Sequence, residues 1–562
     1  MNSTMRPSKE IGANMKKAIL GVILTSILLS AAGCNSKTQK VTHKTPDTSD
    51  IGIIASRRET ENTQSETTES EIKDDRIINL TQRPKNQYDI NVKFNEESNS
   101  ADVEQKLSYV NNTGSELNEI YFNLIPNAFS KKEGGIEVDK ISIGTDDLKM
   151  EQVKETVYKL SLPSPLANGK VVTIDMKYSV KIPLIADRFG FYNNTYNFGN
   201  VLITPALFEN GEWLVQPYVD IGDAFYTEIS DYRVSIDVPD GYLVASTGTR
   251  IDNVFVAENV RDFAFTITKD LDLLCEEYED IALNVFYPKN CPGTGKHVME
   301  VAKKSLSLFN EMLGKYPYDT LNMVLCGMPG GIGGMEYPGL IMMTVDEDIT
   351  ESLFDLYNGK ITVKEYLEKT GDNTDVPSGE PSEPVPEDVI KNTVLYSVNS
   401  LTKSTAHEIG HQWFYGIVGN DEVRYPWIDE GFCRFMEAYY ENTYHDGAND
   451  DFSLFDLLLN MDQSIYNEYK GISDGEVKSV NLNESLYDFM KHKEEYGEIY
   501  YKGAAMIYHM YREMGDEAFR AAVKEYISTF AYTEVTPDEF REFWSKKGDF
   551  AEMFDVYLKK SE

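Results

Sequence analysis

Residues Thr405-Ala-His-Glu-Ile-Gly-His-Gln-Trp-Phe414 decide how this chain is interpreted. They contain His407 and His411, which are four positions apart, and on a helix such positions lie on one face. Two imidazoles placed in this way can bind one tetrahedral Zn²⁺ at about 2.0–2.1 Å each. The stretch therefore predicts a helix that carries two ligands of a zinc ion.

A second motif, Pro426-Trp-Ile-Asp-Glu-Gly-Phe432, supplies the third ligand. A catalytic zinc site needs three protein ligands and one open position. Glu430 is the obvious third ligand, with eighteen residues between it and His411. Glu408 lies between the two histidines and is placed to take a proton from an attacking water as general base. The chain has only 7 His, and two of them lie here, which argues against a chance occurrence of the pattern on an ordinary helix.

Together the two motifs resemble the aminopeptidase-N family of zinc peptidases, within the gluzincins. The pattern of that family is HExxH followed, after eighteen residues, by Glu. The resemblance extends over about residues 86–562 and is strongest from 327 to 503. It implies one Zn²⁺ per chain and removal of the N-terminal residue from peptide substrates.

The stretch Gly333-Gly-Met-Glu336 resembles the exopeptidase motif GxMEN of the same family, with Tyr337 where Asn is usual. This resemblance implies that four residues bind the substrate: Gly333, Gly334, Met335 and Glu336. Glu336 is expected to pair with the free amino group of the substrate. A buried carboxylate–ammonium pair discriminates strongly, because an uncharged N-terminus would leave the carboxylate unpaired. By itself, a glycine-rich loop before a strand would be a plain turn.

Two further residues are candidates for the site. Tyr500-Tyr-Lys-Gly503 resembles the Tyr-x-Lys-Gly of the family, whose tyrosine stabilises the transition state, and the match assigns that role to Tyr500. Glu437 follows Glu430 by seven positions and shares its helical face. It is expected to orient a ligand histidine, although an ordinary surface glutamate is the alternative.

Length and composition limit the possible functions. A chain of 562 residues is too long for one hydrophobic core, so two or three domains are expected. The formal net charge of −38 argues against nucleic acid as a partner, because phosphates would repel the chain. None of the 5 Cys lies in a C-x-x-C pair, which argues against a cysteine-based zinc site. A domain of this size does not need disulfides, and free thiols are expected.

The N-terminal segment is typical of an export signal. Residues 1–14 are interpreted as a spurious extension before Met15, which is followed by two lysines and an apolar run over 18–32. That run is short for a membrane-spanning helix, which needs about 20 apolar residues, but fits a signal peptide. It ends in Leu29-Ser-Ala-Ala-Gly-Cys34, which resembles a bacterial lipoprotein box with Cys34 as the lipidated residue. Ala31 departs from the usual Leu, and an uncleaved membrane anchor is the alternative.

The remainder divides into a tether and two folded parts. Residues 35–85 are rich in Ser, Thr, Glu, Lys and Asp and are expected to be a disordered tether. From Tyr88 onward apolar residues alternate with polar ones, which predicts an antiparallel β-sandwich-like domain over 86–270. The predicted fold class is thus β followed by α+β, with a thermolysin-like, mainly helical zinc peptidase domain over 271–562. Within it we expect a helix over 298–313 and strands over 321–326 and 340–343.

An insertion separates Glu336 from His407, with 70 residues between them. Its centre is rich in Pro, Gly, Asp and Glu, and we expect a mobile acidic insertion over about 351–388, either a surface loop or a lid. Larger members of the family carry a further helical domain that closes the cleft. We expect this chain to lack such a domain and therefore to have a more open active site.

These observations predict a zinc aminopeptidase that is anchored to the bacterial membrane as a lipoprotein and acts outside the cytoplasm. Its expected partners are peptides with a free N-terminus and the membrane, not nucleic acid. Two alternatives stay open: a thermolysin-like zinc endopeptidase, and a non-catalytic cell-surface binding lipoprotein.

Overall fold

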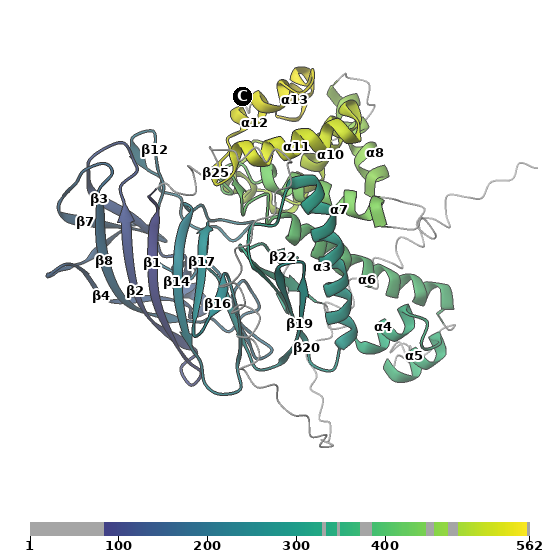
Figure 1. Cartoon of the computed structure of the whole chain (residues 1–562), viewed down its shortest axis with the longest axis horizontal. Helices are drawn as coiled ribbons and strands as arrows, with labels where there is room; N and C mark the ends of the chain where they lie inside the picture. Colours follow the sequence, from purple (N-terminus) through teal and green to yellow (C-terminus); the bar gives the residue numbers. More distant parts are fainter. Residues whose placement is uncertain are drawn as a thin grey trace, which may run out of the picture. The chain divides into compact units, whose positions relative to one another are not determined.

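The structure is a computed structural model that describes residues 84–328, 333–345, 349–370, 385–444, 454–469 and 481–558 (Figure 1). The expected signal peptide, Cys34 and nearly all of the tether lie outside the described residues, as does 371–384 of the acidic insertion. No helix among the described residues combines the length and the apolar character that crossing a membrane requires.

An eight-stranded sheet forms the frame of the N-terminal β domain, in the order β16-β17-β14-β1-β2-β8-β4-β5 (Figure 1). Its strands are β1 (Asn86–Asn95), β2 (Ser100–Val110), β4 (Gly135–Ile143), β5 (Asp146–Leu148), β8 (Val171–Lys181), β14 (Ser230–Asp237), β16 (Thr249–Ile251) and β17 (Val254–Val260). In β1 buried and exposed residues alternate strictly, as the period of two predicts. The expectation of a purely antiparallel domain is wrong at one place, because β1 pairs with β14 in parallel.

Smaller sheets complete this domain. Two have four strands each, in the orders β15-β18-β10-β9 and β11-β3-β7-β6, and β12 and β13 form a hairpin. The strands are β3 (Leu117–Asn123), β6 (Met150–Lys154), β7 (Val157–Leu166), β9 (Phe189–Tyr192), β10 (Thr195–Phe198), β11 (Thr204–Pro205), β12 (Phe208–Glu209), β13 (Glu212–Trp213), β15 (Leu243–Ser246) and β18 (Phe265–Thr268), with a 3₁₀ helix at Ile125–Lys132. Their buried side chains share one hydrophobic core with those of the large sheet, which gives the packed-sheet arrangement that the sequence predicts.

A five-stranded mixed sheet follows, in the order β19-β20-β21-β23-β22. Its strands are β19 (Leu271–Tyr278), β20 (Ile281–Pro288), β21 (Thr320–Cys326), β22 (Gly334–Met335) and β23 (Leu340–Thr344). The expected strands over 321–326 and 340–343 agree with β21 and β23. The helix α3 (Pro292–Leu313) ends at Gly314, whose φ of 109° favours glycine.

The rest of the described chain is mainly helical. It contains α4 (Glu351–Tyr357), α5 (Val363–Thr370), α6 (Glu387–Gly410), α7 (Trp427–Tyr444), α8 (Leu454–Tyr469), α9 (Leu486–Phe489), α10 (Glu498–Met514), α11 (Asp516–Phe530), α12 (Pro537–Ser545) and α13 (Ala551–Tyr557), a 3₁₀ turn at Lys493–Glu495, and the paired short strands β24 (Val418–Gly419) and β25 (Thr533–Glu534). The expectation of a surface loop or lid over about 351–388 needs correction in its described part, because α4, α5 and the start of α6 lie within it. The hydroxyl of Thr350 caps α4, and Leu353 and Phe354 are buried, so this segment adds to the core.

One arginine of the β domain connects it to the loop that follows the metal-binding motif. Arg261, whose side chain is 2% exposed, donates from Nε to the backbone carbonyl of Tyr415 at 2.7 Å. It also donates to the Glu534 carboxylate at 2.6 Å and to the Thr533 carbonyl at 2.7 Å. A Cβ on Gly419 would lie 2.1 Å from the guanidinium, so this close approach requires glycine. All four cysteines among the described residues are free thiols, as their spacing suggests.

Candidate functional site

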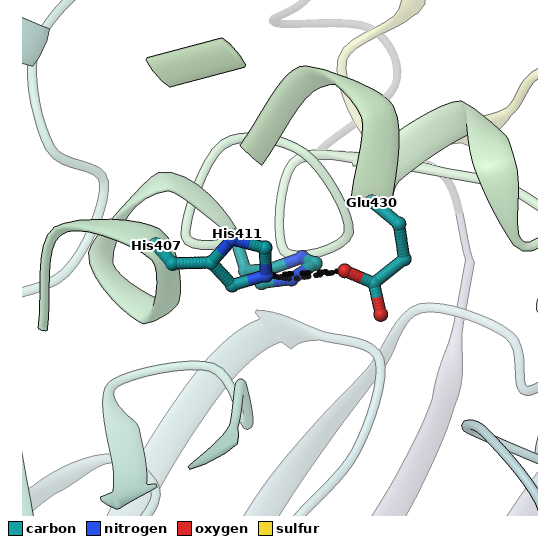
Figure 2. A group of neighbouring side chains, drawn as sticks. All are labelled: His407, His411 and Glu430. Carbon is teal, nitrogen blue, oxygen red and sulfur yellow. Dashed lines mark hydrogen bonds and ion pairs between the residues drawn. The ribbon is translucent and has the colours of Figure 1, made fainter. Parts of the chain in front are cut away.

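The helices α6 and α7 bring His407, His411 and Glu430 together (Figure 2). The Nε2 atoms of His407 and His411 lie 3.1 Å and 3.3 Å from Oε2 of Glu430, and 3.2 Å from each other. Tetrahedral ligand atoms at about 2.0–2.1 Å from a zinc ion are spaced about 3.3 Å apart, so this triangle has the size that Zn²⁺ requires. Within the described ranges, these three residues are the one group of His, Cys, Asp or Glu side chains arranged to hold a metal.

The contacts of the Nδ1 atoms of both imidazoles also support a zinc site. Nδ1 of His411 lies 3.1 Å from the backbone carbonyl of Phe414, which can only accept, so Nδ1 carries the proton and Nε2 presents a lone pair. Nδ1 of His407 faces the Glu437 carboxylate at 3.6 Å. Two neutral imidazoles and one carboxylate, each imidazole oriented from behind, form a donor set that fits Zn²⁺.

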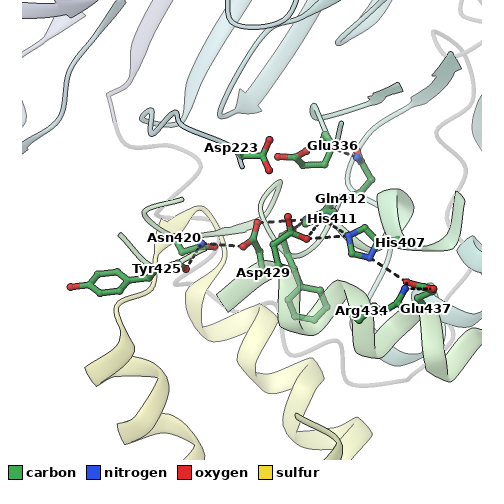
Figure 3. Close-up of polar contacts among 12 residues, drawn as sticks. Asp223, Glu336, His407, His411, Gln412, Asn420, Tyr425, Asp429, Arg434 and Glu437 are labelled. Atoms are coloured by element: carbon green, nitrogen blue, oxygen red, sulfur yellow. Dashed lines mark hydrogen bonds and ion pairs between the residues drawn. The ribbon is translucent and has the colours of Figure 1, made fainter. Parts of the chain in front are cut away.

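Glu437 is buried rather than on the surface (Figure 3). Arg434 donates from Nη1 to both carboxylate oxygens of Glu437 at 2.5 Å, and from Nη2 to the hydroxyl of Tyr501 at 2.7 Å. Burial acts to raise the pKa of Glu437, but Arg434 and His407 outweigh it and hold that pKa below the ordinary value. Glu437 therefore stays charged behind His407. Tyr501 contacts this network, which no sequence motif indicates.

Glu408 lies directly beneath the strand β22. A Cβ on Gly334 would come within 2.1 Å of the Glu408 carboxylate, so only glycine allows this approach. Glu408 is 5% exposed, and burial raises its pKa to about 7, although the neighbouring histidines act in the opposite direction. A carboxyl group with a pKa near neutrality can both accept and release a proton at physiological pH.

Glu336 is a further buried carboxylate of the site. It is 4% exposed, and its Oε1 has no hydrogen-bond partner. In Figure 3 the Asp223 carboxylate, from the β domain, faces that of Glu336. Burial, together with the charge of Asp223, raises the pKa of Glu336 well above its ordinary value. Asp223 is bonded on its other side to Arg188 at 2.6 Å.

Side chains of two other segments form hydrogen bonds with the residues around Glu336. Gln412, directly after the second histidine, places Nε2 3.3 Å from the carbonyls of Glu336 and Tyr337, and its Oε1 accepts from the Gly339 N–H at 2.8 Å. Tyr337 donates its hydroxyl to Asn200 at 2.9 Å. A Cβ on Gly199 would lie 2.1 Å from that hydroxyl, so glycine at 199 makes the space for tyrosine at 337.

Tyr500 reaches the site from α10. The helices α7 and α10 cross closely, because a Cβ on Gly503 would lie 2.9 Å from the Cα of Gly431. This crossing places the Tyr500 ring 6.0 Å from that of His407. Burial and the charge of Glu430 raise the pKa of Tyr500 well above its ordinary value, so its hydroxyl keeps a proton to donate.

The metal-binding residues, Glu408, Glu336 and Tyr500 line one cavity of about 1500 Å³. Its lining includes His407, Glu408, His411, Glu430, Gly333, Gly334, Glu336, Glu437, Tyr500 and Asp223. Of the residues that the sequence assigns to the site, Met335 alone is absent from the lining and is buried in the core of the β domain. Asp223 is the residue that sequence reasoning missed, since an aspartate in a loop carries no local signal.

Comparison with known proteins finds a family model that matches part of the chain. Residues 389–557 match the peptidase family M1 domain. Aminopeptidase N of Lactococcus lactis subsp. lactis is 25% identical over 177 residues, which are 31% of this chain and 20% of that protein. Leukotriene A-4 hydrolase of Xenopus laevis is 27% identical over 154 residues, 27% of this chain and 24% of that protein. The chain spans only 14% to 24% of the length of such curated relatives.

Solved structures extend the likeness to most of the chain. The M1 zinc metallopeptidase from Deinococcus radiodurans superposes with a TM-score of 0.51 at 15% identity, over 85% of this chain and 94% of that one. A mutant of that enzyme bound to a Tyr-Ser-Ala substrate gives a TM-score of 0.50 at 14% identity, over 85% and 94% of the two chains. The likeness confirms the predicted order of the fold, a β domain followed by a mainly helical domain.

Proposed function

The chain carries a peptidase family M1 domain, as its resemblance to the aminopeptidase-N family predicts, and we propose that it is a zinc aminopeptidase. The observation that carries this proposal is the buried carboxylate of Glu336, whose Oε1 has no hydrogen-bond partner, beside the triangle of His407, His411 and Glu430. A buried carboxylate without a partner is costly unless a cation completes it. The ammonium group at the N-terminus of a peptide is such a cation, and an endopeptidase has no use for it.

His407, His411 and Glu430 would hold one Zn²⁺ per chain. When bound, zinc supplies a Lewis acid that lowers the pKa of water and polarises the carbonyl of the scissile bond. Glu437 and Arg434 act on the opposite side of His407. Their buried ion pair holds the imidazole with Nε2 toward the centre of the site.

Glu336 and Asp223 fix the register of the substrate. The ammonium group between their carboxylates would relieve the repulsion that raises the pKa of Glu336. The scissile carbonyl belongs to the same first residue as this ammonium group and is joined to it through one Cα, so binding of the ammonium group would place that carbonyl beside His407 and Glu408. Holding the reacting groups in this way supplies part of the rate enhancement through orientation alone.

Glu408 and Tyr500 handle the proton and the developing charge. Glu408 takes a proton from the attacking water at its carboxylate oxygen and then delivers it to the nitrogen of the leaving amine. The Tyr500 hydroxyl donates a hydrogen bond to the oxygen of the attacked carbonyl as negative charge develops on it. Such a donor is worth more in the transition state than in the ground state.

The test is product analysis with two matched hexapeptides, one with a free and one with an acetylated N-terminus. We expect the free peptide to release single residues from its N-terminus in order, and the acetylated peptide to stay intact. Internal fragments from both peptides would favour an endopeptidase instead. No cleavage by protein that contains zinc would favour a binding protein.

The location of the protein is a separate part of the proposal. We propose that residues 1–34 direct export and that Cys34 carries the lipid which holds the enzyme at the outer side of the bacterial membrane. The support is the composition of 15–34 and the polar, aromatic-poor stretch 35–85, long enough to act as a tether. The formal charge of −38 also suits an exposed surface more than a nucleic-acid partner.

A further inference from the structure

One face of α6 lines the cavity far beyond the metal site. The residues concerned are Asn392, Leu395, Tyr396, Asn399, Ser400 and Lys403. They recur at intervals of three and four, which is the spacing of one helical face, and they lead to His407 in the same row. The opposite face of α6 is buried in the core through Val394, Val398 and Leu401.

This row is longer than the reaction itself requires. Fifteen positions separate Asn392 from His407, and at 1.5 Å per residue they span about 22 Å. Leu454 and Leu457 of α8 line the same cavity. An extended peptide advances about 3.3 Å per residue, so the row is as long as six or seven substrate residues. The cavity volume of about 1500 Å³ also exceeds the roughly 300–1,000 Å³ typical of small-molecule pockets.

The site fixes the direction in which a substrate would run. Gln412, at the C-terminal end of α6, contacts the backbone of Glu336, and Gly334 lies over Glu408. The carboxylate for the substrate ammonium is therefore near the end of α6, and the row runs from His407 toward its start. For a peptide whose N-terminus contacts Glu336, the row offers a path for the residues after its scissile bond.

The side chains of the row suit a peptide. Asn392, Asn399 and Ser400 offer donors and acceptors for a peptide backbone. Tyr396 is 74% exposed, the highest value among the large hydrophobic side chains of the described residues. Its ring is therefore available to stack on a substrate side chain.

We propose that this face of α6, together with the two leucines of α8 that line the same cavity, forms a groove for the residues that follow the scissile bond. The preferred substrates would then be oligopeptides of about seven or eight residues rather than dipeptides. This inference rests on the proposed aminopeptidase function and adds a substrate class to it.

A nested peptide series tests the inference with the full chain. All peptides share the same first residues and range from two to ten residues. We expect kcat/KM to rise with length up to about seven or eight residues and then to level off. An equal kcat/KM for the dipeptide and the octapeptide would overturn the groove. If the protein hydrolyses neither the peptides nor an aminoacyl p-nitroanilide, the aminopeptidase function is refuted, and the groove with it.

Two variants locate the effect on α6. Tyr396→Ala removes the exposed ring, and Ser400→Trp fills the row about 10 Å from His407. Each should lower kcat/KM for the octapeptide about 3- to 10-fold, the size expected for one aromatic contact, and leave an aminoacyl p-nitroanilide unaffected. Tyr357→Ala is the matched control, an exposed tyrosine on α4 that does not line the cavity. Equal effects on both substrates, or wild-type octapeptide kinetics in both variants, would contradict the proposal.

Discussion

Glu336→Gln isolates the charge that makes this site an exopeptidase site. The substitution keeps the size of the side chain and its ability to accept a hydrogen bond, but it removes the negative charge. In the structure Glu336 is 4% exposed and one of its oxygens has no hydrogen-bond partner. Water therefore does not compete with this carboxylate for a bound ammonium group. Asp223 stays in place on the other side, already bonded to Arg188.

The expected loss follows from this arrangement. Removal of one partner of a buried ion pair costs about 3–5 kcal/mol. Because Asp223 still offers a carboxylate to the ammonium group, we expect a loss at the lower end of this energy range. A loss of about 3 kcal/mol corresponds to a fall of about 150-fold in kcat/KM, at 1.36 kcal/mol per factor of ten. The fall should appear in both KM and kcat, since the same pair also sets the position of the scissile bond.

The assay is steady-state hydrolysis of a free-amino peptide, with zinc content measured on the same preparation. Asp462→Asn on α8 is the control, a buried carboxylate bonded to His509 and Tyr557 that does not line the cavity. Its activity should stay within about threefold of wild type. The reasoning is refuted if Glu336→Gln, with its zinc retained, loses less than about fivefold in kcat/KM.

Three further substitutions test other parts of the account. Tyr500→Phe should lower kcat about 10²- to 10³-fold with KM and zinc content unchanged, whereas Tyr508→Phe, on the same helix but outside the cavity lining, should match wild type in the same kinetic assay. Arg434→Ala leaves Glu437 buried without its cation and should weaken zinc affinity about 10- to 100-fold in a competition titration with a chelator; unchanged affinity would show that this ion pair does not support His407. Cys34→Ser should move the protein from the membrane to the soluble or precursor fraction in cell fractionation, and unchanged membrane retention would indicate a plain transmembrane anchor.

The parts of the site that sequence could predict are those encoded by local spacing. His407 and His411 share a helical face wherever that helix is packed, and the structure brings Glu430 within 3.3 Å of both. The assignment of Glu336 rests on the resemblance of residues 333–336 to the exopeptidase motif. Here the structure adds the reason, since Gly334 is required by the approach of β22 to Glu408.

The parts that sequence could not predict depend on contacts between distant segments. Asp223 precedes Glu336 by more than a hundred residues, and only the packing of the β domain against the peptidase domain brings the two carboxylates together. Tyr501 reaches Arg434 because α7 and α10 cross closely, which no local pattern indicates.

Two errors in the predicted fold have physical explanations of different kinds. The parallel pairing of β1 with β14 could not be foreseen, because alternation of apolar residues is the same in parallel and antiparallel neighbours. The helix α4 was foreseeable, since Thr350 before the apolar pair Leu353 and Phe354 is a helix-start signal. The high content of Pro, Gly and acidic residues further along the insertion obscured it.

Zinc analysis of the purified full chain, with activity measured on the same samples, tests the central claim most directly. We predict one Zn²⁺ per chain in the wild type, loss of zinc and activity together in His411→Ala, and loss of activity with zinc retained in Glu408→Gln. Zinc that stays bound in His411→Ala, or an active wild type that contains no metal after chelation, would contradict the assignment of the metal site.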